Sequence, residues 1–143
     1  MSDQMLRLLV GGVLLLHGIA HGGALGALWW VGSGRSVDTG GWTAPRSWVA
    51  PSMAADTTAA VAVVFWLVSM VGFVLTALAF WGIVLPVDWW RPLGVASALV
   101  STAGIVLFFG TWPMFNTLAA LAVNVAVLVA AVNNWPPESV FRG

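Results

Sequence analysis

The chain has 143 residues, and its acidic and basic residues balance to a formal net charge of zero. Hydrophobic residues make up 60% of it and charged residues only 7%, which excludes a soluble globular domain and a disordered chain. The five basic residues are all arginines and are spread along the sequence, so a nucleic-acid surface, which needs clustered positive charge, is excluded as well.

Four apolar stretches predict an all-α integral membrane protein, a bundle of four transmembrane helices that forms one domain over residues 1–143. A helix that crosses a bilayer needs about 20 apolar residues, and the stretches reach or approach that length. The helices are predicted at about residues 5–30, 56–85, 91–110 and 114–132, joined by a long surface loop over residues 31–55.

Residues with strong local preferences mark the ends of these helices. Ser2 and Asp3 suit the cap of the first helix, and Asp56 suits the cap of the second. Pro86 predicts that the second helix has ended by Leu85, because proline cannot continue a helix. The chain also has ten tryptophans and no tyrosine, and tryptophan at the end of a span is typical of a membrane interface.

The arginines predict the orientation of the chain in the membrane. An even number of crossings places both termini on one side, together with Arg7, Arg91 and Arg142, and leaves Arg35 and Arg46 on the other. Because cytoplasmic segments carry an excess of positive charge, we expect cytoplasmic termini.

The first helix carries both histidines of the protein, His17 and His21. They are four residues apart and therefore share one helix face, and a rise of about 1.5 Å per residue places His17 near the middle of the membrane. The helix also resembles a secretory signal peptide, with Arg7 before an apolar run, but the run continues to Val31, so we expect the segment to be retained.

Small and polar residues recur at spacings of three and four in every predicted helix. Lipid favours none of these side chains, so we expect the stripes to face one another, with interhelical hydrogen bonds from the polar members. The candidates for this polar core are Ser69, Thr76, Ser97, Ser101, Asn116 and Asn124.

An ionisable residue inside a membrane is by default a candidate functional group, so His17 and His21 are the candidate cofactor-binding residues. Burial favours neutral imidazole, which can ligate a metal, but a closed metal site needs about two further ligands that the spans lack. A tetrapyrrole, haem or chlorin, needs only one imidazole, and the glycines beside the histidines predict room for a flat ring. The third candidate is a quinone, or another small polar headgroup, that hydrogen-bonds to the pair. A structural pair satisfied by serine or asparagine stays open.

Catalytic patterns are missing from the sequence. It has no cysteine, no Ser-His-carboxylate set and no nucleotide-binding glycine loop, and its only glutamate, Glu138, lies in the tail. We therefore expect no stand-alone enzyme.

The segment Leu6-Arg7-Leu8-Leu9, leading to Leu16-His17-Gly18, resembles the first helix of the DoxX-like family of small four-helix bacterial membrane proteins. The resemblance covers about the first 25 residues and the number of helices. It implies an accessory subunit in the bacterial inner membrane that works with quinone-linked redox partners.

The leading hypothesis is thus an accessory or cofactor-contacting subunit of a larger membrane redox complex, embedded in the lipid bilayer beside other subunits or copies of itself. One alternative is a small oligomeric transporter or channel with a polar interior. Another is a structural assembly factor.

Overall fold

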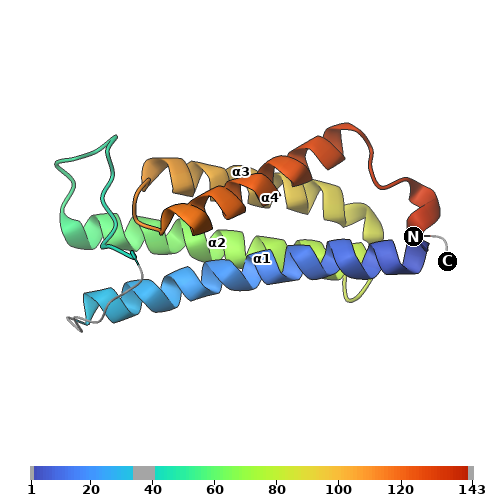
Figure 1. Ribbon diagram of the computed structural model, residues 1–143, viewed down its shortest axis with the longest axis horizontal. Coiled ribbons are helices and arrows are strands. Elements are labelled where there is room, and N and C mark those ends of the chain that lie inside the picture. Colours follow the sequence, from blue (N-terminus) through green and yellow to red (C-terminus); the bar gives the residue numbers. More distant parts are fainter. Residues whose placement is uncertain (1, 34–40, 142–143) are drawn as a thin grey trace.

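The computed structural model describes residues 2–33 and 41–141, and every regular element among them is helical, which confirms the predicted fold class. Two short 3₁₀ helices accompany four long α-helices (Figure 1). In chain order the elements are α1 (Asp3–Gly32), α2 (Ala55–Trp81), η1 (Val87–Trp89), α3 (Trp90–Leu107), α4 (Met114–Val132) and η2 (Glu138–Phe141).

Two of the helices end three or four residues before the predicted position, whereas the other helix ends lie within two residues of the prediction. α2 ends at Trp81 rather than Leu85, because Gly82 takes a left-handed conformation with a φ of 69°. The amides of Gly82 and Ile83 then bond back to the carbonyls of Ala79 and Leu78, a pairing that closes a helix before any proline is reached. Similarly, α3 ends at Leu107 rather than Gly110.

The helices pack in the order of the chain, α1 on α2, α2 on α3 and α3 on α4. Figure 1 shows α1 and α2 running along each other, while α4 crosses them obliquely and moves away from α1 toward its own C-terminal end. The bundle is therefore not closed evenly, because α1 and α4 pack far less on each other than neighbouring helices in the chain do.

All four α-helices are long and apolar enough to cross a membrane. Large apolar side chains such as Leu16, Leu67 and Phe115 are exposed on the outside of the bundle, which suits lipid rather than water. These features indicate an integral membrane protein. η2 packs against α1, so the two ends of the described chain lie at the same end of the bundle (Figure 1). Arg35 and Arg142, on which the predicted orientation partly depends, lie outside the described residues.

Arg7 and Trp81 join α1 to α2 at the end of the bundle that carries the termini. Arg7 Nη2 donates to the Trp81 carbonyl oxygen (2.7 Å), and Trp81 Nε1 donates to the Arg7 carbonyl oxygen (3.0 Å). The guanidinium thus satisfies a carbonyl that the end of α2 leaves open, where a positive charge is also favourable.

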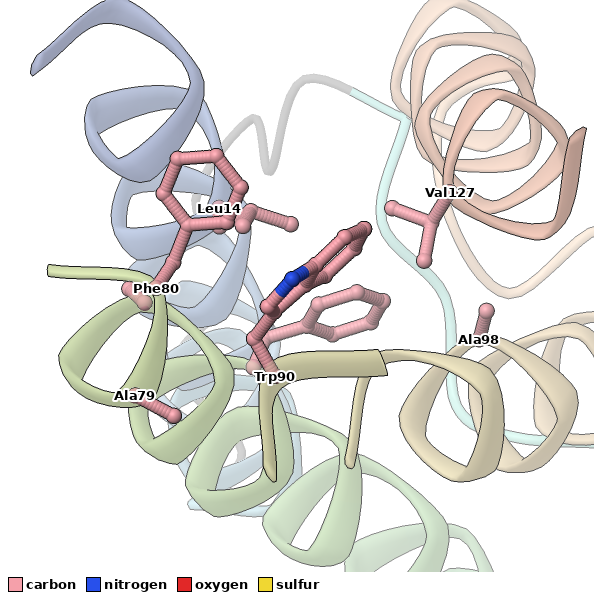
Figure 2. Close-up of a cluster of buried hydrophobic side chains, with 8 residues drawn as sticks. Leu14, Ala79, Phe80, Trp90, Ala98 and Val127 are labelled. Carbon is pink, nitrogen blue, oxygen red and sulfur yellow. The ribbon is translucent and has the colours of Figure 1, made fainter. Parts of the chain in front are cut away.

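Trp90 fills the apolar core near that same end. Its indole lies between Leu14 of α1 and Val127 of α4, close to Phe80 (Figure 2). Trp90 is 3% exposed, whereas its neighbour Trp89 is 55% exposed. Of these two neighbours, Trp89 has the exposure expected of an interfacial tryptophan and Trp90 does not.

The described part of the long loop, residues 41–54, is not helical and folds onto the turn between α3 and α4. Thr43 N donates to the Thr111 carbonyl oxygen (3.1 Å), and Trp48 Nε1 donates to the Val106 carbonyl oxygen (2.6 Å). These bonds hold the loop against the opposite end of the bundle from the termini.

Candidate functional site

Four polar side chains from three helices meet in the interior of the bundle. His17 Nε2 lies 3.0 Å from Asn124 Oδ1, and His21 Nε2 lies 3.1 Å from Ser101 Oγ. Asn124 Nδ2 connects the two pairs, because it donates to Ser101 Oγ (2.9 Å) and to Thr102 Oγ1 (3.1 Å). We call His17, His21, Ser101 and Asn124 the polar network. It joins α1 to α3 and α4 at the depth where water is scarcest.

The hydrogen-bond partners in the polar network restrict where the imidazole protons of His17 and His21 can lie. Asn124 Oδ1 can only accept, so His17 carries its proton on Nε2. Ser101 Oγ accepts from Asn124 and still has a second lone pair and its own hydrogen, so it can either accept from or donate to His21 Nε2, and both neutral tautomers of His21 fit the polar network. His21 Nδ1 has no partner within residues 2–33 and 41–141, although His21 is only 1% exposed. A buried ring nitrogen without a hydrogen-bond partner is costly in either tautomer.

Aromatic rings pack against both imidazoles. The Phe73 ring stands edge-on to His17 at 4.4 Å between centroids and lies parallel to His21 at 6.1 Å. Trp112, from the turn before α4, packs on His21 at 5.2 Å. The histidines thus pack against Phe73 of α2 and, in the case of His21, against the turn before α4.

A cavity of about 330 Å³ opens beside the histidines, in the seam between α1 and α4. We call it the head cavity. His17 and His21 lie on its α1 side, Phe115 and Ala119 on its α4 side, and Trp112 closes one end. None of its lining residues carries a charged side chain. His17 lies about 15 Å along the helix from Arg7, half of a hydrocarbon core of about 30 Å, so the histidine side of the cavity lies near the middle of the membrane. The cavity extends from there toward Trp42 and Trp112 at the loop end of the bundle.

The other predicted core residues behave in two ways. Ser69, Thr76 and Ser97 are buried, but each bonds a carbonyl of its own helix, at 2.7 to 2.8 Å, rather than a neighbouring helix. Asn116 is exposed and lies at the rim of the head cavity, outside the buried core in which the sequence had placed it. Asn116 stands two turns of α4 from Asn124, and the open seam leaves that part of the helix uncovered.

Three residues that complete the site were not predicted from the sequence. Thr102 accepts from Asn124, and Phe73 and Trp112 hold the imidazole rings. Thr102 directly follows Ser101, so a search for hydroxyls next to the polar stripe would have found it. Phe73 and Trp112 give no such signal, because apolar residues at these spacings are common throughout the spans.

The site fits a hydrogen-bonding ligand better than a tetrapyrrole or a metal. Both Nε2 atoms are already hydrogen-bonded. The space beside Gly18 and Gly22 is taken by Met70 and Val74 of α2, so these two glycines serve helix packing and leave no slot for a flat ring on that face. Within residues 2–33 and 41–141, no three histidine, cysteine or carboxylate side chains gather as a metal site would require.

Comparison of the chain with protein-family models, with curated proteins and with solved structures gives no match, so the resemblance to the DoxX-like family stays a prediction.

Proposed function

We propose that this protein binds the headgroup of a quinone in the head cavity and acts as an accessory, quinone-contacting subunit of a larger membrane redox complex. The observation that carries the proposal is an uncharged cavity between α1 and α4 that has His17, His21 and the exposed Asn116 in its lining, next to a His21 Nδ1 that has no partner within residues 2–33 and 41–141. In this proposal the ring proton of His21 is on Nδ1, and the imidazole, whose Nδ1 is covered in this structure, turns toward the cavity to donate to a quinone carbonyl. A quinone is also neutral and lipid-soluble, so it reaches such a site from the membrane.

Some residues around the head cavity hydrogen-bond to the quinone, and others contact its ring. His21 donates to one carbonyl oxygen of the quinone, and Ser101 can donate to His21 Nε2 when the ring proton is on Nδ1. Trp112 and Phe115 offer aromatic surface for the ring, and the exposed amide of Asn116 at the rim is a donor for the second carbonyl oxygen.

A partner supplies or accepts the electrons in this proposal. The chain has no cysteine, and the histidine, asparagine and aromatic side chains at the cavity bind a quinone without exchanging electrons with it. The resemblance of the first helix to DoxX-like proteins favours the same role, and with it a place in the bacterial inner membrane beside other subunits.

We further propose cytoplasmic termini, on the positive-inside rule. Arg7 and Arg91 lie at the end of the bundle that carries the termini, and Arg46 lies in the loop at the other end. The chain has no native cysteine, so single cysteines report on sidedness without interference. In whole cells, Ser33→Cys should react with an impermeant maleimide, and Ser139→Cys should react only after permeabilisation. The opposite pattern would invert the orientation.

Neither alternative role has a specific observation in its favour. A transporter or channel needs a path along the axis of the bundle, whereas the cavity opens between α1 and α4 and the polar network crosses the interior as bonded side chains. An assembly factor would not need the head cavity or an unpartnered ring nitrogen, His21 Nδ1, next to it.

Equilibrium binding of a tail-free benzoquinone to the purified protein in micelles tests the proposal. His21→Phe keeps a ring against Phe73 and Trp112 but removes the donor, so binding should weaken by about tenfold or more, the value of one hydrogen bond of about 1.4 kcal/mol. Ala119→Phe fills the head cavity from α4 and should abolish binding.

The matched control is Ala122→Phe, also on an exposed position of α4 but lining neither of the cavities described here. It should bind the quinone as the parent does. If the parent does not bind the quinone, or if His21→Phe and Ala119→Phe bind it as tightly as the parent, the proposed function is wrong.

A further inference from the structure

A second cavity continues the head cavity along the same seam, toward the end of the bundle that carries the termini. It has a volume of about 240 Å³, and we call it the tail groove. Leu9 and Val10 of α1 line one side, and Ala126 and Ala130 of α4 line the other. Both cavities have Val13 and Val123 in their linings, so they are neighbours along the seam, and we call the two together the path.

The two halves of this path differ in chemistry. The head cavity has both histidines and Asn116 in its lining, whereas every residue that lines the tail groove is aliphatic, proline or tryptophan. Trp90 contributes to the wall of the groove between Leu14 and Val127, as Figure 2 shows for these three side chains. A molecule that fills the whole path therefore has one polar, hydrogen-bonding end and a long apolar remainder.

We propose that the tail groove holds the isoprenoid chain of the quinone whose headgroup occupies the head cavity. The inference rests on the proposed function. From His21 to Leu9 the path runs about 18 Å along α1, at 1.5 Å per residue, which is long enough for several isoprene units. The isoprenoid chain runs from mid-membrane toward the end of the bundle that carries the termini. Val13 and Val123, which line both cavities, contact it where it leaves the ring.

Other occupants fit the path less well. A phospholipid carries a charged phosphate, whereas no residue that lines the polar end of this path has a charged side chain to receive it. A transmembrane helix of a partner is about 10 Å across with its side chains, which is a poor match for cavities of about 240 and 330 Å³.

Binding of two quinones with the same ring, one tail-free and one with several isoprene units, tests the head cavity and the tail groove separately. Ala126 is an exposed residue of α4 that lines only the tail groove, so Ala126→Phe narrows the groove without crowding the core. We expect this variant to weaken binding of the tailed quinone by about tenfold and to leave binding of the tail-free ring unchanged. Ala122→Phe, the control on the lipid face, should change neither.

All measurements use the full chain in one detergent at one micelle concentration. Partition of the tailed quinone into micelles then cancels in the ratio of the variant's dissociation constant to that of the parent. If Ala126→Phe binds the tailed quinone as the parent does, the chain leaves the site directly into lipid and the inference is wrong, while the proposed headgroup site stands. If added phospholipid displaces the tailed quinone and leaves the tail-free ring bound, the groove belongs to acyl chains and the inference is equally wrong. Failure of the tail-free ring to bind would instead contradict the proposed function.

Discussion

The face of α1 toward α2 is closely packed, whereas the face toward α4 lines cavities. Toward α2 the helix is in close contact, with Gly18 against the backbone of Met70 and Val74 and with the paired bonds of Arg7 and Trp81. Toward α4 it is separated by two cavities, and the bond from His17 to Asn124 spans the seam.

The difference shows how a small bundle can combine rigidity with a binding site. In a bilayer the helices gain little from excluding lipid from each other, so a tight seam depends on close backbone approach and a loose one on specific hydrogen bonds. The contact with α2 fixes the position of α1, and the histidines on its other face are thereby held toward an open seam. Three sets of substitutions test this division, from the largest expected effect to the smallest.

Substitution in the tight seam should be the most damaging. A Cβ atom on Gly18 would lie 3.1 Å from the Met70 carbonyl oxygen and from the Val74 amide nitrogen, and backbone atoms cannot move aside as a flexible side chain would. Gly18→Leu should therefore lower the free energy of unfolding by about 3 kcal/mol.

Gly23→Leu is the control, because nothing lies within 4 Å of a Cβ atom at that exposed position. It should leave stability unchanged or raise it slightly, since leucine favours a helix more than glycine does. Unfolding in a mixed micelle by a denaturing detergent measures both. Equal stability of the two variants would show that the contact between α1 and α2 is not the rigid one.

Loss of the bond across the loose seam should have an intermediate effect. Asn124→Leu removes the hydrogen bonds to His17, Ser101 and Thr102. At about 0.6 kcal/mol for an average interhelical bond, we expect a loss of about 2 kcal/mol in the same unfolding measurement. A variant as stable as the parent would mean that the polar network contributes nothing to holding α4.

The smallest effects should come from two serines that are both buried. Ser101→Ala removes a member of the polar network and should cost about 1 kcal/mol. Ser69→Ala should cost about half of that or less, because Ser69 bonds only the Phe65 carbonyl of its own helix, and that carbonyl can still take part in the backbone hydrogen bonds of α2. The reverse order would contradict the distinction between bonds within a helix and bonds between helices.

The sequence by itself determined the fold class and the place of the histidines along the chain. Composition and the length of the apolar runs are enough to predict four spans, because a bilayer allows few other solutions for such segments. α4 runs from Met114 to Val132, where Pro113 and the asparagines after Val132 place its ends. The spacing of His17 and His21 likewise puts them on one face in any α-helix.

Only the tertiary structure decided which polar residues work together. Ser69 and Ser101 look alike in the sequence, yet one bonds its own helix and the other bonds His21. The difference arises from the rotation and crossing of the helices, which helical periodicity leaves open. The same crossing separates α4 from α1, leaves Asn116 at the rim and creates the path from the histidines to the tail groove. A hydrogen bond needs its atoms within about 3 Å, and residues on different helices meet at that distance only after packing has fixed the helices against one another.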